Sequence, residues 1–86
     1  MDEILFKPFE RSYTSQAILK LPPRKRQISV LVARGFSNKE IAEELGISHK
    51  TVKNTVSSLL SIFGVKTRTQ LAAMVADYSA RQEQSS

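Results

Sequence analysis

The chain has 86 residues, enough for one compact domain with a modest hydrophobic core, and no apolar run reaches the roughly 18 residues that a bilayer span needs. It contains no cysteine and one histidine, which excludes disulfides, thiolate metal sites and sites built on histidine pairs. The net charge of +5 and the pI near 9.9 favour a polyanionic partner. Since no N-terminal leader is present either, we expect a cytoplasmic protein without membrane contact.

Residues 1–20 predict a flexible or loosely packed N-terminal arm or linker, because acidic residues precede a mixed segment in which Pro8 discourages a continuous helix. A short helical turn around residues 15–19 is compatible with the sequence. Residues 4–9 are unusually apolar for a free tail. They either pack back on this domain or contact a missing regulatory domain or protein partner, and both alternatives stand at this point.

The first predicted helix begins at two prolines, Pro22 and Pro23, where a missing amide hydrogen costs nothing. Apolar residues then recur at helical spacing until Gly35. A second helix follows from Ser37 to Leu45, since Ser37 and the glutamate three residues later form a capping box.

Gly46 supplies a sharp turn, and Ser48 caps a third helix over residues 49–63. A period of 3.6 residues divides this helix into two stripes. The apolar stripe contains Val52, Val56, Leu59, Leu60 and Phe63, and the polar stripe contains Lys50, Lys53, Asn54, Ser57 and Ser61. Two short helices around a glycine turn, the second with an uninterrupted polar stripe, are typical of a helix-turn-helix that reads DNA.

A fourth helix is predicted to begin at the capping box formed by Thr67 and Gln70 and to end near Arg81. Its core face comprises Leu71, Ala72, Val75 and Tyr78. Residues 82–86 have nothing to bury and are expected to form a disordered tail. The predicted fold is therefore an all-α bundle of four helices over residues 21–81.

Positive charge is concentrated in the helical region. Between Lys20 and Arg68 the sequence has ten lysines and arginines and three glutamates, which leaves a local charge of +7. Such a density favours a polyanion, because cations that contact phosphates release the counterions condensed on them.

Four segments together resemble the DNA-binding domain of the LuxR/GerE family: LPPRKRQI, FSNKEIAEELGIS, KTVKNTVSSLLSIFGV and KTRTQLAAM. The segments run from Leu21 to Met74, and the resemblance covers the chain roughly to Tyr78. The family provides the effector domain of many bacterial response regulators and quorum-sensing activators, and it also forms short stand-alone GerE-like regulators. The resemblance implies a sequence-specific transcription regulator whose third helix enters the major groove, with no cofactor, no metal and no small-molecule ligand.

The resemblance also implies roles for individual positions. The base-contacting positions are Lys53, Asn54 and Ser57; the DNA backbone-contacting positions are Asn38, Lys39, Lys50, Thr51, Lys66 and Arg68. The family commonly binds DNA as a homodimer through the fourth helix, where Ala73, Met74 and Asp77 lie beside the core stripe. The chemistry of the first group agrees, since lysine can donate to guanine, asparagine can pair with adenine, and serine suits either.

Four positions depart from the family pattern, the first being Pro22, where the family usually has a threonine as helix cap. Lys25 and Gln27 replace two glutamates that resemble partners for an arginine at position 68. Their loss leaves Arg68 freer to contact DNA or leaves its loop less fixed. Thr55 replaces a histidine that usually follows the asparagine, which removes one expected backbone contact.

Other functions fit the sequence less well. A sigma-factor region 4 module shares the helix-turn-helix, but the downstream segment GVKTRTQLAAM disfavours it. A protein-interaction or dimerising antagonist module that has lost DNA binding stays open because of the departures. Catalysis is not expected, since Glu40, Glu43 and Glu44 are predicted on an exposed helical face without a cleft and no nucleophile motif is present.

Overall fold

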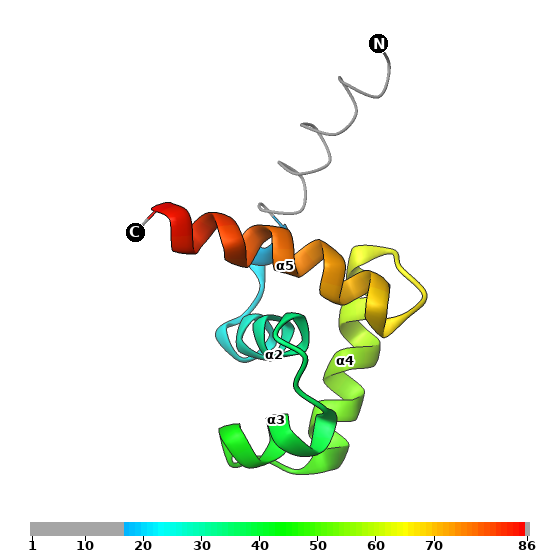
Figure 1. Ribbon diagram of the computed structural model, residues 1–86. Helices are drawn as coiled ribbons and strands as arrows, with labels where there is room; N and C mark the ends of the chain where they lie inside the picture. Colours follow the sequence, from blue (N-terminus) through cyan, green and yellow to red (C-terminus); the bar gives the residue numbers. More distant parts are fainter. Residues whose placement is uncertain (1–16, 86) are drawn as a thin grey trace.

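The computed structural model describes the backbone of residues 17–85 and the side chains of residues 17–77. After a helical segment at 17–20, it contains the helices α2 (Pro23–Ala33), α3 (Asn38–Leu45), α4 (His49–Phe63) and α5 (Arg68–Ser85) (Figure 1). No strand occurs within residues 17–85, so the all-α fold class is confirmed there. The predicted contacts of residues 4–9, and the rest of the arm before residue 17, lie outside the described residues.

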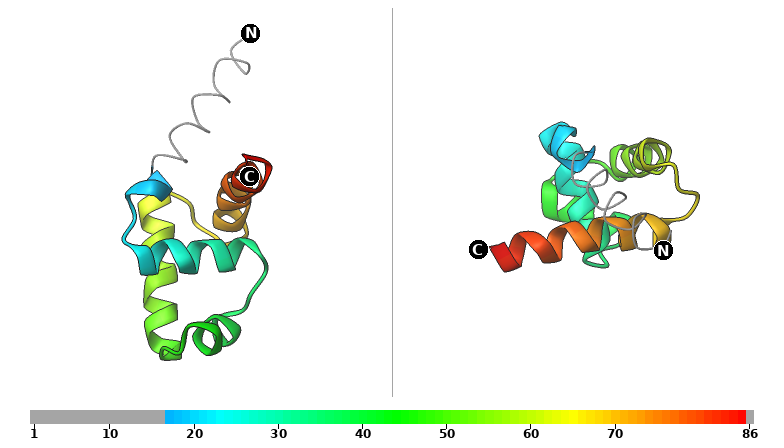
Figure 2. Two further views of the ribbon diagram at one scale, coloured as in Figure 1. Left: turned by 90° about the vertical axis from the view of Figure 1, so that its left-hand side faces the viewer. Right: turned by 90° about the horizontal axis from the view of Figure 1, so that it is seen from above.

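The helices are arranged around α2 and α4, which cross each other in the middle of the bundle (Figures 1 and 2). α3 lies beside the first turns of α4, and α5 lies across the opposite end of the bundle. α2 packs most extensively against α5, whereas α3 packs mainly against α4. The helix-turn-helix formed by α3 and α4 is therefore attached to α2 and α5 mainly through α4.

Local sequence signals account for the helix boundaries. α2 begins with Pro22 as N-cap and a second proline within its first two positions, as predicted. Gly46 and Gly64 end α3 and α4 in the left-handed conformation, each with φ near 67°. A residue with a Cβ would be strained at these two positions, because the left-handed region suits glycine.

The hydrophobic core is formed by one face of every described helix. Its buried residues are Ile18, Leu21, Ile28, Val32, Ile41, Ala42, Val52, Val56, Leu59, Phe63, Leu71 and Val75. Leu60 and Ala72, which were predicted on the inward faces of their helices, are partly buried at the edge of the core, as are Leu31 and Leu45. Tyr78 lies outside the residues with described side chains.

The packed domain begins before the predicted boundary at residue 21. Ile18 is fully buried and Leu21 is 7% exposed, so the segment 17–20 belongs to the bundle and not to the arm. The amide of Leu21 donates to the carbonyl of Ile18, which holds both side chains at one turn of the chain. A segment of four residues is too short to show a helical period, which explains the misplaced boundary.

The last helix is longer than the sequence predicted. α5 continues past Arg81, its expected end, to Ser85, which corrects the expectation that residues 82–85 are without regular structure. The segment contains no glycine or proline, and glutamine and glutamate are good helix formers, so local propensity continues the helix. No helix within residues 17–85 is both long and apolar enough to cross a membrane.

The start of α3 is fixed by the capping box that the sequence predicted. The Ser37 hydroxyl oxygen accepts from the Glu40 amide at 3.1 Å, and the Ser37 amide donates to the Glu40 carboxylate at 2.8 Å. Two amide groups that have no partner within the helix are thereby satisfied.

The Ser37→Ala variant should therefore be less stable by about 1 kcal/mol, because it leaves the Glu40 amide without its side-chain acceptor. Urea unfolding followed by circular dichroism measures the change. Glu43→Ala is the matched control, since Glu43 is exposed within the same helix, and its effect should stay within about 0.5 kcal/mol. Equal losses in the two variants would contradict a capping role.

Candidate nucleic-acid interface

The two faces of α4 have opposite exposure, as the sequence predicted. Val52, Val56, Leu59 and Phe63 are buried against the other helices. The opposite stripe is fully on the surface and consists of Lys50, Lys53, Asn54, Ser57 and Ser61. It carries hydrogen-bond donors and acceptors along the whole helix and no carboxylate. Such a face can donate to and accept from base edges, because an α-helix fits the major groove of B-DNA.

The turn before α4 fixes the start of this helix. The amide of Ile47 donates to the carbonyl of Ala42 at 3.1 Å, which closes the turn at Gly46. The Ser48 hydroxyl oxygen accepts from the Thr51 amide at 3.0 Å, while the Ser48 hydroxyl donates to the Thr51 hydroxyl oxygen at 2.8 Å. The first turn of α4 is thus ordered by its own N-cap.

Arg68 does not behave as the sequence led us to expect. Its Nη1 donates to Oδ1 of Asn38 at 2.7 Å, and its Nη2 donates to the carbonyl of Phe36 at 2.6 Å. Two of the five N–H donors of the guanidinium are therefore engaged within the domain although the family's glutamates are absent. An amide oxygen and a backbone carbonyl take the place of carboxylate partners, a pairing between distant segments that no local sequence pattern indicates.

These hydrogen bonds bring two groups of predicted backbone-contacting residues together. Asn38 and Lys39 begin α3, whereas Lys66 and Arg68 lie some thirty residues later at the start of α5. The loop before α5 is held by the Gln70 side chain, whose oxygen accepts from the amides of Lys66 at 2.9 Å and Thr67 at 3.3 Å. The backbone amide of Gln70 in turn donates to the Thr67 hydroxyl oxygen at 3.1 Å, which confirms the predicted capping box.

The lysines predicted to contact the DNA backbone are all on the surface. Lys39 lies in the first turn of α3, Lys50 in the first turn of α4, and Lys66 in the loop before α5; all three are exposed. His49 is exposed as well. The three lysines thus come from three separate segments of the chain, each next to a helix N-terminus, where positive potential from the backbone also favours phosphate oxygens.

The predicted self-association surface lies on α5. Ala73 and Asp77 are exposed, while Met74 is partly buried against the core. Asp77 follows Ala73 by four positions and Met74 by three, so it neighbours both on the helix surface.

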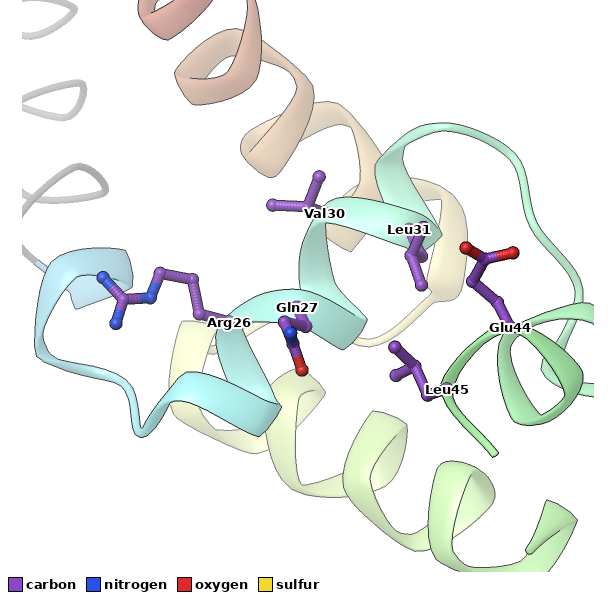
Figure 3. A pocket seen from close by; sticks show the side chains of 6 residues that line it. All are labelled: Arg26, Gln27, Val30, Leu31, Glu44 and Leu45. Carbon is purple, nitrogen blue, oxygen red and sulfur yellow. The ribbon is translucent and has the colours of Figure 1, made fainter. Parts of the chain in front are cut away.

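A second surface feature is a shallow groove of about 370 Å³ between α2 and α3 (Figure 3). It is lined by Arg26, Gln27, Val30, Leu31, Glu44 and Leu45. The expectation that the glutamates of α3 lie away from any cleft is therefore wrong for Glu44, because α3 is set against α2 on that side. None of the six lining residues is among those predicted to contact DNA.

The buried Ser29 was not singled out by its sequence context. It is fully buried in α2, and its hydroxyl donates to the carbonyl of Arg26 at 2.8 Å. A serine hydroxyl that bonds back to the preceding turn is satisfied inside its own helix. Ser29 is therefore part of the packing of α2 and not of the polar surface.

A helix-turn-helix with an exposed polar face on its second helix, set in a basic all-α domain, defines a DNA-binding transcription regulator. Residues 19–75 match the family of bacterial regulatory proteins described as the luxR family, and the chain belongs to this family.

Similar proteins include several bacterial regulators. The chain is 41% identical over 63 residues to the two-component response regulator PprB of Pseudomonas aeruginosa. The aligned region covers 73% of the chain and 23% of PprB. It is 44% identical over 64 residues to the uncharacterized transcriptional regulatory protein YhcZ of Bacillus subtilis, covering 74% of the chain and 30% of YhcZ. It is 48% identical over 52 residues to the transcriptional regulatory protein LiaR of Bacillus subtilis. This match covers 60% of the chain and 25% of LiaR. The chain thus spans about a quarter of the length of these relatives.

Proposed function

We propose that this chain binds duplex DNA in a sequence-specific manner, with α4 in the major groove, and thereby regulates transcription. The exposed polar stripe of α4, backed by a buried apolar stripe, is the observation that carries the proposal. The face presents a cation, an amide and hydroxyls within three turns, which are the groups that read guanine, adenine and mixed base edges.

In this proposal, base contacts and phosphate contacts come from different residues. Lys53, Asn54 and Ser57 contact base edges and determine which sequence is bound. Phosphate contacts position the domain and come from Asn38, Lys39, Lys50, Thr51 and Lys66. Arg68, which was also predicted in this second group, is considered separately below, because two of its five N–H donors bond to Asn38 and Phe36.

We propose further that two copies bind together through the face of α5 that carries Ala73, Met74 and Asp77. Ala73 is small and exposed, so a second helix can approach closely, and Met74 contributes apolar surface. A two-fold dimer would place its two α4 helices on half-sites related by inverted symmetry, one helical turn of DNA or a multiple of it apart.

The regulator acts in the bacterial cytoplasm under this proposal, because its ligand is chromosomal DNA. PprB is by its name a two-component response regulator, and the region matched here is under a third of it. We propose that the chain works as an effector domain controlled by a regulatory domain or a separate partner, with residues 4–9 as the segment that contacts it.

Fluorescence anisotropy with labelled duplexes tests the proposal. A selection of bound oligonucleotides first supplies the preferred sequence, and affinity is then measured for it and for random duplex over a series of salt concentrations. Binding should weaken steeply as salt rises, because phosphate contacts release counterions. Affinity that is equal for all sequences, or that hardly responds to salt, would instead indicate an interaction module that has lost specific DNA binding.

The Lys66→Ala variant should weaken binding to preferred and random duplex by the same factor. An exposed lysine that contacts a phosphate carries no sequence information, so its loss leaves the ratio of the two affinities unchanged. The slope of log affinity against log salt should become shallower by about 0.9, since one phosphate contact is lost. The same anisotropy titrations give both values. A change in the ratio without a change in slope would contradict a phosphate contact.

A further inference from the structure

The guanidinium of Arg68 holds both sides of the N-cap of α3. Its acceptors are the carbonyl of Phe36 at 2.6 Å and the side-chain oxygen of Asn38 at 2.7 Å, and these two residues flank the N-cap Ser37. Arg68 is itself the first residue of α5 and is partly buried. The planar fork of a guanidinium fixes direction as well as distance when two of its nitrogens donate. The start of α3 is therefore tied to the start of α5.

α3 has little else that attaches it to the rest of the bundle. The helix has eight residues and buries only Ile41 and Ala42. Its packing is mainly against α4, with little against α2 and very few backbone contacts with α5. The other side-chain hydrogen bonds described above join residues three or four positions apart. The two bonds of Arg68 thus supply a directional connection that packing does not provide.

We infer that Arg68 is a positioning residue for DNA binding: it locks the helix-turn-helix at a fixed orientation to α5 and does not itself contact DNA. The inference rests on the proposed function. If α5 carries the dimer face, this lock also transmits the dimer geometry to α3 and from there to α4. A helix-turn-helix that turns relative to α5 would present its two copies to the half-sites at the wrong spacing.

Arg68→Lys is the decisive variant because it keeps the positive charge and removes the fork. A lysine offers a single nitrogen, which cannot hold the two acceptors in one plane. A positioning role predicts that affinity for the preferred duplex falls about tenfold, the equivalent of one charge-assisted hydrogen bond, at an unchanged salt slope. Retained affinity would overturn the inference, since a direct phosphate contact tolerates lysine and a purely structural bond affects only folding. Thermal unfolding of each variant sets a temperature at which all are folded.

Asn38→Ala provides an independent variant if Arg68→Lys fails to fold. It removes one acceptor from the other side of the lock, and the cost of Arg68→Lys should be clearly smaller in the Asn38→Ala background than in the wild type. If the affinity loss of the double variant equals the product of the losses of the two single variants, the inference is overturned. Lys66→Ala serves as the matched control, because an exposed phosphate contact two residues away should combine independently with Arg68→Lys.

The wild-type titration separates the two ways in which these ideas could fail. If the wild type binds no DNA, the proposed function and the positioning role are both rejected. If the wild type binds in a salt-dependent manner and Arg68→Lys binds equally well, only the positioning role is rejected. Spectra of the Asn38 side-chain amide without DNA complete the test, because its NMR signals should shift in Arg68→Lys if the bond exists in solution.

Discussion

The Lys53→Ala variant should lose most of its preference for the selected duplex while it keeps its weak affinity for random DNA. Lys53 is exposed in the second turn of α4, on the polar stripe, where the helix is expected to lie against base edges. A lysine that donates to guanine O6 and N7 discriminates by about 1 to 3 kcal/mol, which corresponds to a factor of about 5 to 150 in relative affinity. The measurement is the ratio of the two dissociation constants at one salt concentration.

The comparison with Lys66→Ala makes this prediction specific. Both variants remove one exposed positive charge, so a purely electrostatic effect would be the same in each. Only Lys53→Ala should relax the base preference in a repeated oligonucleotide selection, at one position of each half-site. Equal losses on preferred and random duplex in both variants would contradict the assignment of Lys53 to base recognition.

The largest effect on stability is expected for Leu59→Ala. Leu59 is fully buried on the inner face of α4, where it packs among residues of the central cluster. Removing a buried leucine side chain typically costs about 2 to 5 kcal/mol, because the transfer free energy is lost and the neighbours do not fill the cavity. Domains of this size have a free energy of unfolding of only about 4 to 13 kcal/mol, so the substitution should remove a large part of the stability. Urea unfolding measures the loss.

Ile62 offers a matched control on the same helix. It is 40% exposed, so Ile62→Ala removes apolar surface that is already partly in contact with water and should leave no closed cavity. Its cost should be well below that of Leu59→Ala. A similar loss in the two variants would show that α4 does not depend on the inward stripe for its stability.

Most of the helix-turn-helix could be predicted because its signals are local. The capping serines of α3 and α4 and the glycines that follow both helices act through hydrogen bonds or torsion angles within a few residues. The predicted bounds of 49–63 for α4 are those observed for this reason. The division of α4 into buried and exposed stripes also follows from sequence alone, because it depends only on the helical period.

Features that depend on distant contacts were missed. Ile18 enters the core although its segment has no recognisable period, because the bundle offers it an apolar surface. Arg68 bonds to Asn38 and Phe36, thirty or more residues away, and charge reasoning alone suggested only carboxylates or DNA as partners. The groove beside Glu44 likewise exists only because α2 and α3 pack at that point. Each of these depends on tertiary packing that a single sequence does not specify.

The separation of the two stripes of α4 has an evolutionary consequence. No residue belongs to both, and two of the outward positions, Ser57 and Ser61, carry only short hydroxyl side chains. Under the proposed function, substitutions at an outward base-contacting position such as Ser57 would alter which operator is selected and leave the folding free energy nearly unchanged. A duplicated copy of this gene could therefore acquire a new set of target promoters through a few outward changes, with no compensating mutation in its interior.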